Sequence, residues 1–237
     1  MSKVGGYGTR HASSLRIAHH ALLIAILLLA FALRTHLLGA QSLWNDEGSS
    51  YVQATRSLAD IAYHAGRDIH PPLYYWGLAG WRALAGESEY ALRLLSTFAS
   101  LLTLALTAAL GRRLFGGVGA LAAALFVALN SFSIYYAQEA RMYALLALWG
   151  VMSLWLLARV LGTNWNRRAA EDAQKRLKHE GTEDKPRTDG INAVPTARDP
   201  VGTAFMPSAA HLRHVAALGV VNAAGLYTQY AYLYLLL

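Results

Sequence analysis

Two adjacent carboxylates, Asp46 and Glu47, are the best-placed candidates for chemistry, because they follow the first long apolar segment of the chain. They lie within residues 42–51, which read Ser-Leu-Trp-Asn-Asp-Glu-Gly-Ser-Ser-Tyr. Ionisable groups at the edge of a membrane are costly to desolvate and usually serve a function, such as general-base catalysis. The sequence leaves one alternative open, in which Asp46 caps a helix and Glu47 occupies its first turn.

Two other polar motifs carry groups that suit phosphate or metal chemistry. His70 follows Asp68 and precedes two prolines, while Glu139 and Arg141 lie in the segment Gln-Glu-Ala-Arg. An imidazole or a carboxylate can bind a metal ion, and a guanidinium matches the geometry of a phosphate. Each motif also has a structural interpretation: His70 as a helix-start residue, and Glu139 and Arg141 as ordinary anchors at the membrane interface.

The composition is that of a membrane protein. Of 237 residues, 55% are hydrophobic and 15% are charged, and the apolar residues come in long blocks. The absence of cysteine excludes a disulfide framework, a thiolate metal site and a cysteine nucleophile. The net charge of +7 does not indicate nucleic-acid binding, because most basic residues fall in segments expected to face the cytoplasm.

The apolar blocks predict an all-α membrane protein, a polytopic transmembrane helix bundle of about five spans. We expect them at about residues 17–38, 90–110, 117–136, 142–161 and 214–237. The basic N-terminus leads into the first span without a cleavage pattern, which favours a retained signal anchor with a cytoplasmic N-terminus. Arg34, near the far end of that span, is expected to snorkel to the interface, the alternative being contact with an anionic ligand.

The connecting segments predict how the spans alternate. Residues 39–89 are acidic and form an outer loop with interfacial helices, one amphipathic from Gly48 to Ala65 and one that Pro71-Pro72 opens and that runs to about Ala85. Residues 162–213 predict a flexible cytoplasmic loop with one short helix near 167–179. This divides the chain into a transmembrane region (1–161), a polar loop (162–213) and a fifth span (214–237). Alternation brings all three polar motifs to the extracytoplasmic face.

Several motifs occur together in an order that resembles a known family. They are Leu-Trp-Asn-Asp-Glu (43–47), His-Pro-Pro-Leu-Tyr-Tyr-Trp (70–76), Arg-Leu (93–94), Gly-Arg-Arg-Leu-Phe (111–115) and Tyr-Ala-Gln-Glu-Ala-Arg-Met-Tyr (136–143). The set is similar to the N-terminal half of the GT-C type glycosyltransferases (glycosyltransferase family 39) that use polyprenyl-phosphate sugars. Protein O-mannosyltransferases, aminoarabinose transferases and bacterial lipopolysaccharide sugar transferases are members. The resemblance covers about residues 15–160.

The resemblance implies a role for each motif. Asp46 corresponds to the acid that acts on the acceptor as general base, with Glu47 beside it; Glu139 corresponds to the acid of the second outer loop, and Arg141 faces the donor phosphate. His70 lies where other members place a basic or metal-contacting residue, so a divalent metal held by Asp46, Glu139 and His70 is part of the expectation. The implied reaction transfers a sugar from a polyprenyl phosphate to a protein, lipid or glycan acceptor, usually with inversion, on the outer face of the plasma (inner) membrane.

The chain departs from this pattern in having few spans and a long polar segment at 163–213. Family members have more spans, so we expect the sequence to be the N-terminal part of a longer protein. Two other classes stay open: a transporter or channel fragment, and a non-catalytic membrane assembly subunit. A transporter favours polar groups or broken helices in the middle of spans, whereas here the polar groups gather at one face.

Overall fold

The computed structural model describes residues 7–68, 70–162 and 209–228, and every regular element within them is a helix. The elements in chain order are α1 (Tyr7–Thr35), α2 (Asn45–Ala54), α3 (Leu58–Ala65), α4 (Leu73–Ala85), α5 (Glu89–Leu129) and α6 (Ser131–Ala137). A further helix follows at Tyr143–Gly162, and α8 (Ala209–Thr228) is the last described element. The all-α fold is therefore confirmed.

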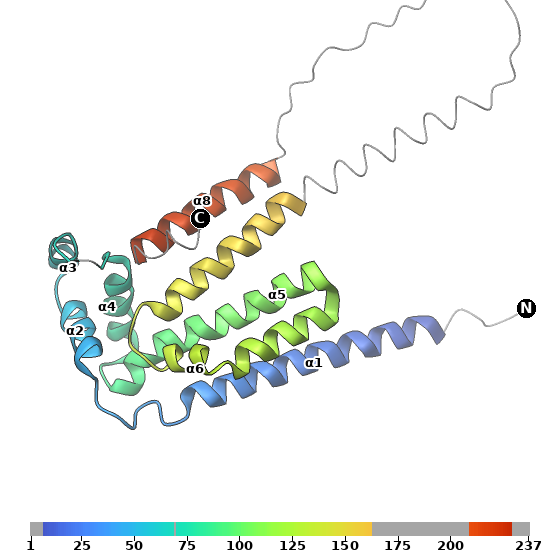
Figure 1. The fold of residues 1–237 in the computed structure, drawn as a ribbon, viewed down its shortest axis with the longest axis horizontal. Helices are drawn as coiled ribbons and strands as arrows, with labels where there is room; N and C mark the ends of the chain where they lie inside the picture. Colours follow the sequence, from blue (N-terminus) through green and yellow to red (C-terminus); the bar gives the residue numbers. More distant parts are fainter. Residues whose placement is uncertain (1–6, 69, 163–208, 229–237) are drawn as a thin grey trace, which may run out of the picture. The chain divides into compact units, whose positions relative to one another are not determined.

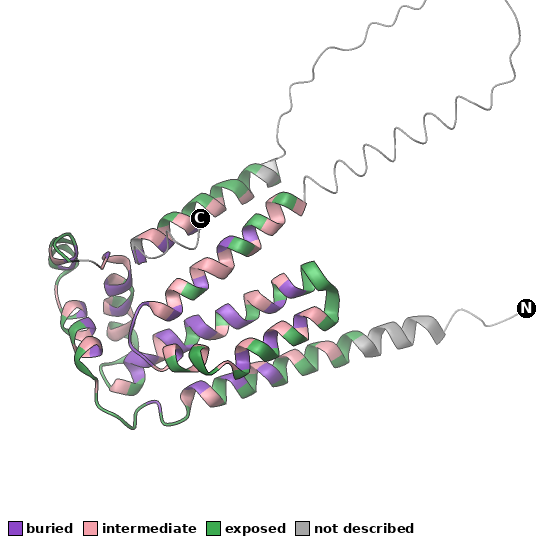
Figure 2. Cartoon of the chain, viewed as in Figure 1, coloured by how far each residue is buried: buried purple, intermediate pink, exposed green. Residues whose placement is uncertain are grey.

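Within the described residues, three helices are long and apolar enough to cross a membrane: Arg16–Thr35, Glu89–Leu129 and Tyr143–Gly162. Many positions along these helices are exposed or half-buried (Figure 2). The exposed apolar residues include Leu28, which is 64% exposed, and Phe126, which is 71% exposed. Such exposure suits contact with lipid and would be costly in water. The chain is an integral membrane protein.

The predicted second and third spans are the two limbs of α5, which folds back on itself at Gly116 (Figure 1). Gly116 has φ +78°, a backbone conformation that glycine adopts without steric cost. Gly111 lets the limbs approach closely, because a Cβ atom at this position would lie 2.8 Å from the carbonyl oxygen of Gly119. The antiparallel pairing of these two limbs agrees with the sequence prediction.

Two boundaries differ from the prediction. The amphipathic segment 48–65 is two helices, because the chain leaves the helical conformation after Ala54 and Ser57 then caps α3 by accepting a bond from the Asp60 N–H. The second limb of α5 ends at Leu129, where the Asn130 side chain accepts from the Ser133 N–H and starts α6. The predicted fifth span lies partly outside the described residues. Residues 163–208 of the predicted loop, with its short helix, lie wholly outside them.

Arg34 does not snorkel, and that prediction is wrong. The side chain is fully buried, and each of its five N–H groups has an acceptor among its neighbours, which is why burial is tolerated. The acceptors are the Ser100 and Ser133 hydroxyls and the carbonyls of Ala30, Val127 and Ala128. Two of these carbonyls belong to the last turn of α5, where helix carbonyls lack intrahelical partners and a cation is favoured.

The chain forms two compact units by contacts, residues 1–155 with 219–237, and residues 156–218. Within the first unit, α1, the start of α5 and α6 bring residues 36–88 and 130–142 to one end of the helices, which we call the motif end (Figure 1). All the predicted site residues lie there. In the second unit the Arg159 guanidinium lies 3.5 Å from Nε2 of His214.

Candidate active site

Glu47 lies at the centre of the motif end, in the first turn of α2, and is only 1% exposed. Its carboxylate accepts from the Arg93 guanidinium through two bonds, 2.9 Å from Nε to Oε1 and 2.7 Å from Nη2 to Oε2. It also accepts from the backbone N–H of Ala140 at 2.7 Å. Glu47 thus joins α2 to α5 and to the turn after α6, which makes it a positioning residue as much as a candidate catalyst.

The pKa of Glu47 depends on opposing effects of burial and of its hydrogen-bond partners. Burial alone would raise it, but the hydrogen bond from Arg93, the Ala140 N–H and the charge of Arg93 together hold it below its usual value. Glu47 is therefore a carboxylate at neutral pH, with its oxygens already occupied. Such a group suits the orientation of α2 better than the removal of a proton.

Arg93 is a site residue that the sequence analysis does not identify as such. It was noted only as part of a motif at the start of a span, yet its five N–H groups hold the whole loop that leads into α2. Besides the two bonds to Glu47, it donates to the carbonyls of Leu38 and Gln41, each at 2.8 Å, and of Ser42 at 3.3 Å. The signal was available, because a charged residue inside an apolar span indicates a functional or structural partner.

Asp46 differs from its neighbour in being accessible. Its side chain is 44% exposed, and its Oδ2 lies 3.6 Å from Nη2 of Arg141. Arg141 is 6% exposed, and its Nη1 donates to the backbone carbonyl of Asp46 at 3.1 Å and to the Ser50 hydroxyl at 3.3 Å. The structure thus brings together two groups that are 95 residues apart in the chain.

The turn that carries Glu139 and Arg141 is fixed to the first limb of α5. Ser96 donates to the carbonyl of Arg141 at 3.2 Å, and Thr97 donates to that of Ala137 at 3.0 Å. Gln138 links the same turn to the end of α1, because its side-chain amide donates to the carbonyl of His36 at 3.0 Å. These contacts give the second acidic motif a defined position relative to α2.

Two buried polar atoms near this pair have no hydrogen-bond partner within the described residues: Nε of Arg141 and the hydroxyl of Tyr74. Tyr74 is 1% exposed, lies at the start of α4, and interacts electrostatically with Arg141 and Glu47. Unpaired buried donors are costly and call for an explanation such as an absent ligand. The Arg141 guanidinium beside Asp46 therefore has one N–H group that no acceptor within the described residues satisfies.

Glu139 is 7% exposed, and its pKa is raised. Burial is the main cause; the negative charges of Glu47 and Asp46 act in the same direction, whereas the Tyr135 hydrogen bond and Arg141 oppose it. Because ionisation is disfavoured in the folded state, stability should decrease as the pH rises from about 4.5, the unperturbed value, through the folded pKa.

We expect Glu139→Gln to abolish that decrease. The variant and the wild type should have similar melting temperatures at pH 4, and the variant should be the more stable at pH 7, as measured by thermal unfolding in nanodiscs. Glu89→Gln is the control; Glu89 lies in the first turn of α5, where a negative charge is favourable, so its loss should not stabilise. Equal pH dependence in the wild type and Glu139→Gln would contradict the assignment.

The contact that His70 makes is with Asp68, outside this arrangement. Its Nδ1 is 3.6 Å from Oδ2 of Asp68, and the two prolines that follow it lead into α4 at Leu73, as the sequence predicted. No group of three carboxylate, imidazole or thiol side chains comes together as a metal site within the part of the chain that the structure describes. Asp46, Glu139 and His70 do not form such a group here, and a divalent metal at this site stays a prediction.

Comparison with known proteins supports the interpretation of the site. Residues 69–168 match the family described as dolichyl-phosphate-mannose-protein mannosyltransferase. This segment of the chain is similar to the GT-C glycosyltransferases. The match includes His70, Arg93, Glu139 and Arg141 but begins after Asp46 and Glu47, whose contacts with the matched segment are those of the structure. No curated protein and no solved structure matches the chain.

Proposed function

We propose that this protein transfers a sugar from a polyprenyl-phosphate donor to an acceptor on the extracytoplasmic face of the plasma membrane. One observation carries the proposal: an accessible carboxylate, Asp46, lies beside a guanidinium whose Nε is buried without a partner in the described residues. A base for the acceptor and a cation for a phosphate are the two groups that such a transfer requires. The GT-C family match supports the same class of reaction.

In the proposed step, the carboxylate of Asp46 takes the proton of the acceptor hydroxyl while the hydroxyl oxygen forms a bond to C1 of the donor sugar. The bond between C1 and the phosphate oxygen breaks, and its electron pair leaves with the polyprenyl phosphate. Attack from the face opposite the phosphate inverts the configuration at C1. Arg141 offsets the charge that develops on the departing phosphate, and His70, on the α4 side, is a second candidate contact for it.

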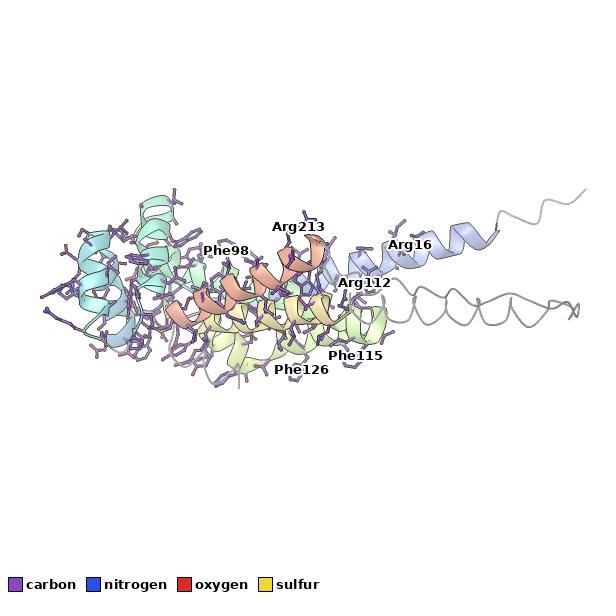
Figure 3. The ribbon with its side chains drawn as sticks, turned by 90° about the horizontal axis from the view of Figure 1, so that it is seen from above. Arg16, Phe98, Arg112, Phe115, Phe126 and Arg213 are labelled. Atoms are coloured by element: carbon purple, nitrogen blue, oxygen red, sulfur yellow. The ribbon has the colours of Figure 1, made fainter. Side chains whose placement is uncertain are left out.

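The charge distribution supports the orientation. Arg112 and Phe115 lie at the turn of α5, and Arg16 lies on the same end of α1, away from α2 and α3 (Figure 3). Basic residues flanking spans favour the cytoplasmic side. The motif end would then face outward, with the N-terminus in the cytoplasm.

The test is transfer from a radiolabelled polyprenyl-phosphate sugar by the protein expressed from its complete gene and reconstituted in proteoliposomes. We expect Arg141→Gln to lower kcat/KM for the donor by about 10- to 100-fold, since hydrogen bonds to charged groups contribute about 1.5–3 kcal/mol. The kcat/KM of Arg141→Lys should lie between those of the wild type and Arg141→Gln, because an ammonium keeps the positive charge but lacks the planar set of N–H donors of a guanidinium. Arg112→Gln, a basic residue at the opposite end, is the control. Unchanged donor kinetics in Arg141→Gln would remove the phosphate role, and no transfer by the wild type would remove the proposed function.

A further inference from the structure

A cavity of about 600 Å³ opens beside the candidate site, on the Glu47 side of α2. Its lining comes from the end of α1 and the loop before α2, from Glu47 and Arg93, and from α6 and the turn after it, whereas Asp46 and Arg141 are not part of it. The volume is typical of sites that bind small molecules. Arg141, whose Nε has no partner within the described residues, is therefore not part of this lining.

The cavity is not built to bind a phosphate. Among the described residues that line it, Arg93 is the only arginine or lysine, and all five of its N–H groups are engaged by Glu47 and the carbonyls of residues 38, 41 and 42. Glu47 balances the charge of Arg93, and the second lining carboxyl, Glu139, adds nothing positive in either protonation state. The lining's other basic side chain is His36, at the end of α1. A phosphate would find no free guanidinium there.

The other lining groups are those that recognise a sugar ring. Trp44 and Tyr135 are 47% and 57% exposed, so each ring has a face open to a ligand. Aromatic rings provide flat apolar surfaces for the C–H faces of a sugar, and amide, hydroxyl and carboxyl groups bind its hydroxyls. Gln41, Ser42 and Glu139 supply those polar groups on the same lining.

We propose that this cavity, which Glu47 lines, holds a neutral, hydroxyl-rich sugar of the acceptor and presents it to the neighbouring Asp46. This deepens the proposed function and rests on it: the donor phosphate would lie at Arg141 and the acceptor in the cavity. The acceptor would then be a glycan or a glycolipid and not a bare polypeptide.

The proposal can be tested by binding, without turnover. The probes are the methyl glycosides of glucose, galactose, mannose and arabinose, with glucosamine and inorganic phosphate as the charged comparisons. Saturation-transfer NMR is recorded on the complete protein in nanodiscs, titrated to 100 mM. We expect at least one neutral glycoside to bind, with about tenfold weaker affinity in Trp44→Ala and in Tyr135→Ala. Tyr63→Ala, an exposed aromatic of α3 outside the cavity, should bind as the wild type does.

Several results would overturn it: no glycoside binding by the wild type, equal binding by all the variants, or binding of glucosamine alone. Phosphate that displaces the glycoside and depends on Trp44 would assign the cavity to the donor instead. Because binding and transfer are measured separately, glycoside binding in a protein that shows no transfer would uphold the cavity as a sugar-binding site but would reject the proposed enzyme and, with it, the acceptor role of the cavity. Circular dichroism of each variant shows that its helices are intact.

Discussion

Asp46→Asn, in the protein expressed from its complete gene, is expected to lower kcat for sugar transfer by about 10²–10⁴-fold, the usual contribution of a general base. The amide keeps the size and shape of the carboxyl but cannot take the acceptor proton. Folding should be little affected, because Asp46 is 44% exposed and its 3.6 Å approach to Arg141 is a partly solvated ion pair of small energetic value. Radiolabelled donor turnover, measured at saturating donor, checks the result.

The matched control is Asp60→Asn. Asp60 is an exposed aspartate of α3 whose side chain accepts from Ser57, a bond that an amide oxygen can also accept. It should retain wild-type turnover, and Asp46→Glu, which moves the carboxylate by one methylene, should recover part of it. If Asp46→Asn turns over at the wild-type rate while its melting temperature is unchanged, Asp46 is not the base.

Much of the fold was predictable because membrane spans carry a strong local signal. The apolar blocks located α1, both limbs of α5 and the helix Tyr143–Gly162, and Pro71-Pro72 located the start of α4. Arg34 was not predictable, since hydropathy cannot show that serine hydroxyls and helix-end carbonyls from two other helices surround its guanidinium. The break between α2 and α3 was visible only as a capping serine inside an otherwise amphipathic pattern.

The residues of the site could be predicted from the sequence, but the different roles of the two adjacent acids could not. Alternating the spans placed Asp46, Glu47, Glu139 and Arg141 at one end, and the structure brings them together there. Nothing in the sequence distinguishes the two adjacent acids, because their difference arises from helix geometry: α2 turns Glu47 toward Arg93 and leaves Asp46 accessible. Residues one position apart on a helix do not share a face.

The second large effect is expected for Arg93→Met. Removing this guanidinium leaves Glu47, which is 1% exposed, without its counter-charge, and breaking a buried pair in this way costs about 3–5 kcal/mol. The carbonyls of residues 38, 41 and 42 also lose their donor, so the loop before α2 should loosen and turnover should decrease, because a 1 Å misplacement of a catalytic group can cost about 10²-fold. Denaturation in mixed micelles, followed by circular dichroism, measures the stability.

The pH dependence of stability tests whether the unpaired charge of Glu47 causes the loss of stability in Arg93→Met. In the wild type the pKa of Glu47 is held below its unperturbed value of 4.5, so its contribution to stability is present above that pH and is lost as the pH falls through the folded pKa. In Arg93→Met only burial and the backbone donors remain, and burial favours the protonated acid, so acidification should lessen the defect. Glu47→Gln combined with Arg93→Met should also recover part of the lost stability, because the amide oxygen can still accept from Ala140. Arg112→Met, an exposed arginine of the same helix, should show neither effect. A defect in Arg93→Met that neither low pH nor Glu47→Gln relieves would mean that the loop contacts of Arg93, and not its pairing with Glu47, hold α2 in place.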